Sequence, residues 1–200
     1  MATVASVQKS EDVAFVRRSV LLLPDKPDRV VTLRLLRLPK TEEQREAIFA
    51  AAEADFVAAA KEAKEAKRPV LRFVWDFGCI PLDPSLSMPS AWLERNREAM
   101  KTGLLRSAVI VANLFSKRLV PMFHGADKDL PPSQIFRDNK TVKICGAKHS
   151  LGAWDAYNYI LRGEGQPKFT GTFLAKMLAD PDISRKYLPP WQPTSADTAQ

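Results

Sequence analysis

Residues 70–77, VLRFVWDF, are apolar at nearly every position, and residues 108–112 (AVIVA) and 142–145 (VKIC) follow a similar pattern. A strand that is apolar on both faces is buried on both faces, as in parallel or mixed sheets covered by helices. Helical patterns at 91–103 and 114–126 separate the three runs, so strands and helices alternate along the chain. The sequence therefore predicts an α/β fold. The three runs should lie side by side in a mixed or mainly parallel sheet with helices on its faces.

Two further apolar runs, 19–23 and 30–38, lie nearer the N-terminus and are separated by residues 24–28, PDKPD. Proline and aspartate at these positions are typical of a turn. The second run alternates apolar and polar residues, as a strand with one exposed face does. The two runs predict a β-hairpin. The polar residues 1–18 before it are expected to form a flexible N-terminal arm.

A long helix is predicted over residues 41–67, because Thr41 to Gln44 match a capping box with acidic residues in the first turn. At ~1.5 Å per residue the helix is about 40 Å long, more than a small sheet can cover. Its second half carries only alanine on the apolar stripe. That half is expected either to project into solvent, held by helix propensity and spaced charges, or to pack closely against a partner helix. The stripe consists of Phe49, Ala52, Phe56, Ala59, Ala63 and Ala66.

The C-terminal part of the chain contains one more helical pattern, at 151–162, before the glycines and proline of 163–167 interrupt it. We therefore expect a single α/β domain over 19–162. Residues 163–200 should form an extension with a short helix at 172–179 and a proline-rich tail. Tyr187 and Trp191 are unusual for a purely solvated tail, and they are candidates for contact with the domain or with another protein.

Composition favours a cytoplasmic protein without a metal or cofactor. The chain has two cysteines, Cys79 and Cys145, without CxxC spacing, so we expect both to be reduced. No apolar stretch approaches the ~20 residues of a membrane-spanning helix, and the first residues lack the pattern of a secretory signal. The net charge of +7 is scattered rather than clustered. Nucleic-acid binding is therefore only a weak alternative.

Polar residues follow the predicted strands, where open α/β sheets bind ligands. Asp76 and Asn113 follow two of them, and Lys148, His149 and Ser150 follow the third. Free amides at the start of the next helix, together with Lys148, would suit an anion. The alternative is an ordinary helix start without a ligand. No catalytic residue is predicted, because the chain has no GxSxG, GxxxxGK[ST] or GxGxxG motif.

The stretch from Pro69 to Arg162 resembles the STAS family, the fold of anti-sigma-factor antagonists, and especially its lipid-binding-like, SpoIIAA-like variants. A strand ending in Asp76, a helix with Trp92, an arginine-led strand at 106–111 and a helix with Ala153-Trp154 carry the resemblance. It implies a regulatory binding module, which some members switch by phosphorylating a serine in a DSxG-type loop. The corresponding loop here contains Ser85 and Ser87, but a proline follows its aspartate and it has no glycine.

These features predict a non-enzymatic protein-interaction, scaffold or regulatory module with a STAS-like domain. It would bind another protein or a larger complex through the loop of Ser85 and Ser87 or through one of two apolar surfaces. These surfaces are the helix residues Phe56, Ala59, Ala63 and Ala66, and the tail residues Tyr187 and Trp191. The alternative is a small-molecule or anion-binding protein, or an enzyme, that uses the residues at the strand ends: Asp76, Asn113, Lys148 and His149.

Overall fold

The computed structural model describes residues 7–13, 16–23, 27–78, 89–111, 129–137, 141–144 and 147–162; the side chains of the strands at 7–13, 141–144 and 147–150 lie outside this description. The chain forms a six-stranded sheet in the order β1-β2-β3-β4-β5-β6 and a separate two-stranded sheet, β7-β8. The strands are β1 (Val7–Val13), β2 (Val16–Leu22), β3 (Arg29–Leu35), β4 (Leu71–Phe77), β5 (Leu104–Val111), β6 (Ser133–Arg137), β7 (Thr141–Ile144) and β8 (Ala147–Ser150). The helices are α1 (Glu42–Ala66), α2 (Ser90–Gly103) and α4 (Leu151–Arg162).

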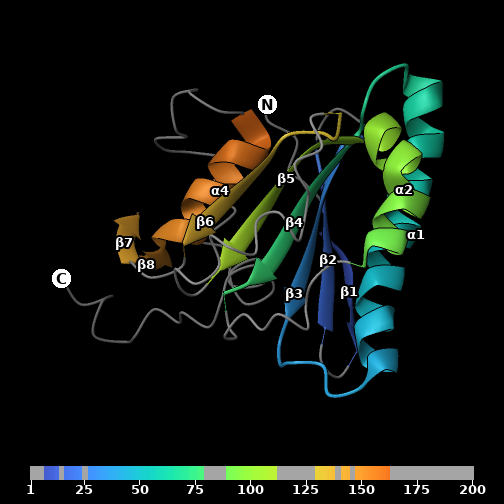
Figure 1. Cartoon of the computed structure of the whole chain (residues 1–200). Coiled ribbons are helices and arrows are strands. Elements are labelled where there is room, and N and C mark those ends of the chain that lie inside the picture. The colour runs from blue at the N-terminus through green and yellow to red at the C-terminus, as the bar shows by residue number, and fades with distance from the viewer. Residues whose placement is uncertain are drawn as a thin grey trace.

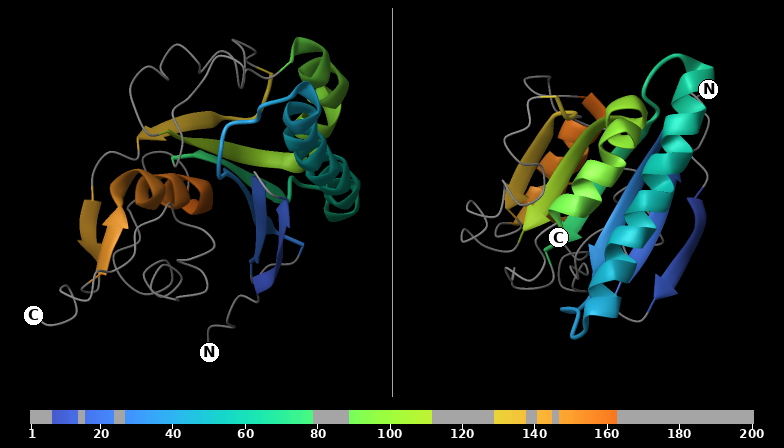
Figure 2. Two further views of the ribbon diagram at one scale, coloured as in Figure 1. Left: turned by 90° about the horizontal axis from the view of Figure 1, so that it is seen from below. Right: turned by 45° about the vertical axis from the view of Figure 1, so that its right-hand side comes forward.

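The main sheet is mixed and mostly parallel. β2 runs antiparallel to both β1 and β3, and β3 to β6 are parallel to one another. α1 and α2 lie side by side on one face of this sheet, and α4 covers the other (Figures 1 and 2). The predicted α/β class and the hairpin of β2 and β3 are therefore confirmed. Among the described helices, none is long and apolar enough to cross a membrane.

Two expectations about the strands were wrong. Residues 7–13 form β1, which pairs with β2, so the N-terminal segment is not wholly a flexible arm. Of the run predicted at 142–145, residues 142–144 do not join the main sheet: Thr141–Ile144 is β7 of the small hairpin, and β6 occupies the place beside β5. Cys145 lies outside the described residues. Both missed strands, β1 and β6, lie at the edges of the sheet. Edge strands commonly carry polar and charged residues, so they lack the apolar pattern of central strands.

The long helix α1 begins and ends almost where its sequence predicts. The Thr41 hydroxyl accepts a hydrogen bond from the Gln44 amide at 3.3 Å, and the Gln44 side chain accepts one from the Lys40 amide at 2.8 Å. These two bonds satisfy amides that have no partner within the helix. At the other end Lys67 adopts a left-handed conformation with φ of 54° and donates its amide to the Ala63 carbonyl. Local sequence therefore fixes both ends of α1.

The alanine half of α1 packs against α2 of the same chain. Gly103 at the end of α2 lies so close that a Cβ atom there would be 2.6 Å from the Ala60 amide nitrogen. Phe56, Ala59 and Ala63 are buried in this core, and Ala66 packs partly against it. The expected partner helix is therefore internal, and these residues do not form an open docking surface for another protein. The expectation of a solvated second half is also wrong along this stripe.

Candidate functional site

Two parts of the ligand site expected at the strand ends lie within the described residues, and both differ from the expectation. Asp76 is fully buried, and its carboxylate accepts hydrogen bonds from Arg34 Nε at 2.7 Å and from the Gly78 amide at 3.0 Å. A ligand would have to displace Arg34 from this carboxylate. Asp76 is therefore a structural partner of Arg34 and not the wall of an open crevice.

The residues expected at the third strand end lie elsewhere in the fold. Lys148, His149 and Ser150 are within β8, where Lys148 pairs with Lys143 and His149 with Val142. They do not form the predicted loop between a buried strand and a helix. Several other predicted site residues lie outside the described residues: Asn113, Ser85, Ser87, Tyr187 and Trp191.

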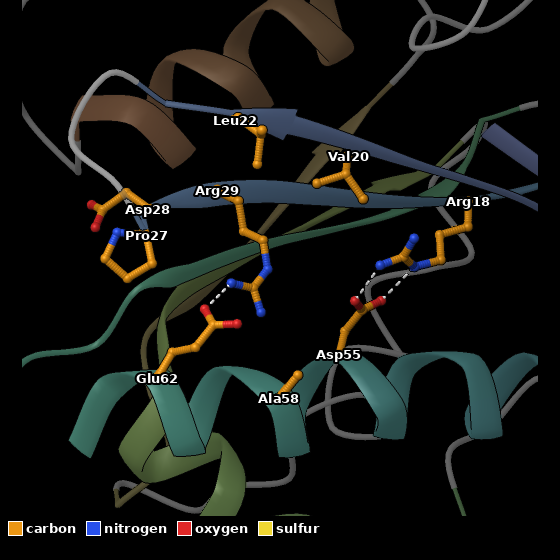
Figure 3. A pocket seen from close by; sticks show the side chains of 9 residues that line it. All are labelled: Arg18, Val20, Leu22, Pro27, Asp28, Arg29, Asp55, Ala58 and Glu62. Carbon is orange, nitrogen blue, oxygen red and sulfur yellow. Dashed lines mark hydrogen bonds and ion pairs between the residues drawn. The ribbon is translucent and has the colours of Figure 1, made fainter. Parts of the chain in front are cut away.

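A groove lies instead between β2 and the middle of α1 (Figure 3). Its volume is about 410 Å³, within the range of small ligand pockets. Alternate residues of β2 face the helix, and residues of α1 three and four positions apart face back. Nine residues line the groove: Arg18, Val20, Leu22, Pro27, Asp28, Arg29, Asp55, Ala58 and Glu62.

Side-chain length explains why this space stays open. Ala58, at the centre of the helical wall, is too short to reach the strand. Arg18 and Arg29 extend from the sheet to the helix on either side of it (Figure 3). The apolar side chains of Val20 and Leu22 form the sheet side of the groove. The groove is therefore bounded by two long charged bridges and has an apolar centre.

The two bridges are ion pairs of different geometry. Arg18 binds Asp55 through two hydrogen bonds, Nε to Oδ2 at 2.9 Å and Nη2 to Oδ1 at 2.6 Å, a bidentate arrangement that also fixes orientation. Arg29 donates to Glu62 through one nitrogen. In the first pair the arginine side chain is 31% exposed and the aspartate 5%; in the second the arginine is 11% exposed and the glutamate 36%. One end of the groove thus presents a guanidinium group and the other a carboxylate.

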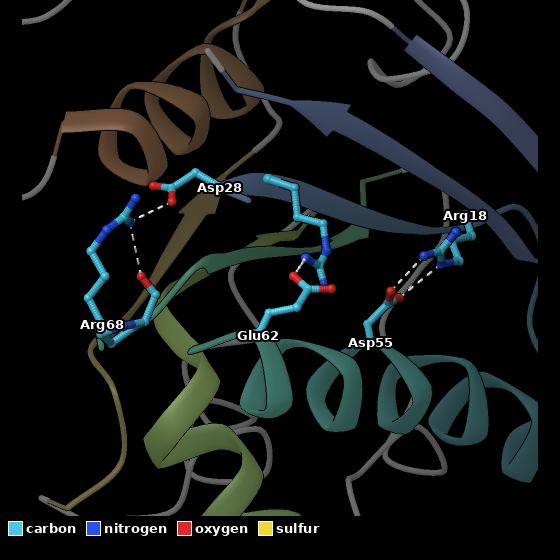
Figure 4. Close-up of polar contacts among 7 residues, drawn as sticks. Arg18, Asp28, Asp55, Glu62 and Arg68 are labelled. Carbon is cyan, nitrogen blue, oxygen red and sulfur yellow. Dashed lines mark hydrogen bonds and ion pairs between the residues drawn. The ribbon is translucent and has the colours of Figure 1, made fainter. Parts of the chain in front are cut away.

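Asp28 closes the glutamate end of the groove. Its carboxylate accepts a hydrogen bond from Arg68, after the end of α1 (Figure 4). It also accepts one from Arg72 of β4. These contacts connect the turn between β2 and β3 to the neighbouring strand and helix end. All three groove carboxylates are therefore bound to arginine side chains.

The groove lining has no histidine, cysteine or serine that would act as a nucleophile or general base. Among the described residues there is also no group of three or more histidine, cysteine, aspartate or glutamate side chains suited to a metal ion. Paired charges in fixed orientations beside apolar side chains suit recognition of a ligand. The chemistry that this arrangement supports best is binding.

Sequence reasoning missed this site, although one residue could have indicated it. Asp55 lies beside Phe56 on the buried side of an alanine-rich helix, where an acid is costly without a partner. A buried acid at that position predicts a basic partner from the sheet. The identity of the partner, Arg18, depends on strand register, which the sequence pattern does not reveal.

Comparisons with protein-family models, with curated proteins and with solved structures find no match to this chain.

Proposed function

We propose that this protein is a non-enzymatic interaction module, of regulatory or scaffold type, that binds an extended segment of another protein in the groove between β2 and α1. The observation that carries this proposal is the polarity of the groove, with the Arg18 guanidinium exposed at one end and the Glu62 carboxylate at the other. The resemblance to STAS proteins, which are mostly regulatory binding modules, supports the same class of function.

The polarity of the groove specifies the charge order of the bound segment. Its acidic side chain would lie at the Arg18 end and its basic side chain at the Glu62 end, with a small apolar side chain between them over Ala58. Electrostatic complementarity of this kind gives orientation and register more than raw affinity. The segment would therefore bind in one direction.

The dimensions of the groove favour an extended segment over a helix. Asp55 and Glu62 are seven residues apart on α1, which corresponds to about 10 Å along the helix axis. An extended chain covers about 10 Å in three residues. A helix is itself ~10 Å across, and the space of about 410 Å³ suits a few side chains better than a whole helix. We therefore expect an acidic and a basic residue three positions apart.

The state of the groove carboxylates supports binding over catalysis. Asp28, Asp55 and Glu62 each accept a hydrogen bond from arginine, whereas a general acid or base must exchange a proton with its substrate. The same bonds hold the arginine side chains in place before a ligand arrives. Such preorganisation reduces the entropy cost of binding.

A peptide library displayed on phage and selected on the whole chain tests the proposal. We expect enrichment of peptides with an acid and a base three positions apart, and fluorescence polarisation of a labelled enriched peptide then gives its Kd. Ala58→Trp fills the groove from an exposed position of α1, so it should weaken binding at least tenfold. Val57→Trp places the same side chain at the neighbouring position, which is 55% exposed and outside the groove lining, and should leave Kd within about twofold.

A charge variant checks the polarity separately from the shape. Glu62→Gln removes the more exposed carboxylate charge at one end of the groove and should weaken binding of the enriched peptide several-fold. The effect should be smaller at high salt because exposed charges are screened. The proposal fails if no peptide is enriched, or if the enriched peptides bind the Ala58→Trp variant as tightly as the unmodified chain.

A further inference from the structure

Three arginine residues follow one another near the amino ends of β4 and β5, with Arg72 between Arg68 and Arg106. Arg72 of β4 and Arg106 of β5 are direct register partners in neighbouring parallel strands, so their side chains leave the same face of the sheet. Like charges in such positions destabilise a sheet. Arg68 approaches from the end of α1 and binds the same carboxylate as Arg72, that of Asp28. We call Arg68, Arg72 and Arg106 the arginine row.

The arginine row has fewer acceptors than donors. Arg72 gives one hydrogen bond to Asp28, Nη1 to Oδ2 at 3.0 Å, and Arg106 gives one to the Tyr159 carbonyl, Nη1 to O at 3.1 Å. The Nε groups of both Arg72 and Arg106 are buried and have no acceptor. A buried donor without an acceptor costs ~1–3 kcal/mol, and more when it is charged. Arg106 also lies over the Tyr159 ring, with Cζ 5.8 Å from the ring centroid, but this contact does not provide an acceptor for its Nε group.

The arginine row also has more positive than negative charge. The Asp28 carboxylate pairs with Arg68 and Arg72, Arg106 donates to a backbone carbonyl instead, and Arg29 beside Asp28 is bound to Glu62. Burial lowers the pKa of the Arg106 guanidinium, Tyr159 opposes this effect, and the neighbouring Arg72 lowers the pKa further. Because arginine stays protonated in proteins, the row retains a net charge of about +2.

We propose that the arginine row binds a phosphate group. The forked guanidinium donors match phosphate oxygens two at a time, and a dianion would offset the remaining positive charge of the row. The Arg68 side chain is 46% exposed and the Arg72 side chain 14%, so Arg68 provides the access to solvent. The phosphate belongs either to a soluble phosphomonoester or to a lipid headgroup, because both present the same oxygens. This proposal does not depend on the peptide groove.

Isothermal titration calorimetry of the whole chain with inorganic phosphate, at constant ionic strength set with chloride, tests the site. We expect saturable binding that Arg106→Gln weakens at least tenfold and that Arg68→Gln weakens less. Arg95→Gln is the matched control, because Arg95 is an exposed arginine of α2 that is paired with Glu53; it should leave Kd within about twofold. Phosphate binding that is absent, or that is the same in Arg106→Gln and Arg95→Gln, overturns the proposal.

Asp28→Asn separates a phosphate site from a purely structural cluster. The variant removes the carboxylate that pairs with both Arg68 and Arg72, so the protein alone should unfold at a lower temperature. Phosphate should bind it several-fold more tightly than it binds the unmodified chain and should raise its unfolding temperature more than chloride does, because a ligand of the folded state stabilises it. A variant that is destabilised but responds equally to phosphate and chloride overturns the proposal.

Two further titrations identify the source of the phosphate. Phosphoserine represents a soluble phosphomonoester, and phosphatidylcholine vesicles with or without phosphatidic acid represent a lipid headgroup. Binding of either probe that Arg106→Gln weakens and Arg95→Gln does not supports the site and names its ligand class. Failure of both probes overturns it.

Discussion

The face of the sheet beneath α1 and α2 carries a cluster of packed aromatic rings around Trp75, whereas the face toward α4 buries the ion pair of Arg34 and Asp76. Both faces come from alternate residues of the same strands. In β4, Phe73 and Trp75 point to the first face, with ring centroids 4.8 Å apart, and Arg72 and Asp76 point to the second. The same strand therefore contributes to two cores of different chemistry.

The two faces differ in how their contributions to stability depend on partners. Apolar side chains gain free energy from area removed from water, which does not require one particular neighbour. Buried charged groups are stable only while their partners remain, and a broken pair costs more than an absent one. The α4 face holds Arg34 with Asp76 and Thr32 with Tyr157, whose hydroxyl oxygens are 2.8 Å apart. We expect substitutions on that face to be strongly coupled.

The largest losses of stability are expected for substitutions at two neighbouring positions of β4 that face opposite sides of the sheet. Trp75→Ala leaves a cavity in the aromatic core and should lower the free energy of unfolding by ~3–5 kcal/mol. Asp76→Ala should cost a similar ~3–5 kcal/mol, because it leaves the Arg34 charge buried without this carboxylate. Arg34→Met combined with Asp76→Leu should recover most of that loss. Urea unfolding of the single and double variants measures the coupling, and additive losses at Arg34 and Asp76 would contradict it.

A close helix contact gives the next largest effect. At Gly103 an alanine would gain up to about 1 kcal/mol of helix propensity. Its Cβ would lie 2.6 Å from the Ala60 nitrogen and 2.7 Å from the Ala59 carbonyl carbon. Since both contacts are backbone atoms that cannot rotate away, steric strain of ~1–3 kcal/mol should exceed the gain. Thermal unfolding should show Gly103→Ala less stable, while Glu98→Ala on the exposed side of α2 should stay within about 0.5 kcal/mol. A Gly103→Ala variant as stable as the unmodified chain would contradict the predicted contact.

The aromatic face was predictable from sequence and the charged face was not. β4 was predicted from the apolar pattern of 70–77, and α1 from the apolar stripe and capping residues of 41–67. Burial on one side of an element produces a regular spacing of apolar residues, and helix ends require particular capping residues, so both can be recognised in the sequence. The pairing of Arg34 with Asp76 depends on the parallel register of β3 and β4, which no local pattern encodes. The groove has the same origin: its charged walls come from 18–29 and 55–62, and only the placement of α1 over β2 brings them together.

The smallest effect should come from a charge at the rim of the aromatic face. Glu53 of α1 accepts hydrogen bonds from Arg95 and Asn96 of α2, at 3.0 and 3.2 Å from its Oε2 atom. The hydrogen bond from Arg95 is the main cause that holds the pKa of Glu53 below its ordinary value, against a smaller opposing effect of burial. Because the folded pKa is lowered, the stabilisation is present above the unfolded pKa and is lost as pH falls through the folded pKa.

Glu53→Gln should therefore destabilise the protein by about 1 kcal/mol or less at neutral pH. The difference from the unmodified chain should shrink as the pH falls through the lowered pKa of Glu53, because a protonated glutamate and a glutamine are both uncharged. Glu98→Gln, at a carboxylate that is 85% exposed, should show little difference at any pH. Urea unfolding across this pH range makes the comparison. If the difference in unfolding free energy between the two proteins does not change with pH, the effect of Glu53 does not come from its charge. If the difference closes at low pH, the effect comes from the charge. We expect the closing difference. The Glu53 charge, at the rim of the aromatic face, should then contribute about 1 kcal/mol or less, whereas the buried pair of Arg34 and Asp76 should contribute several times more.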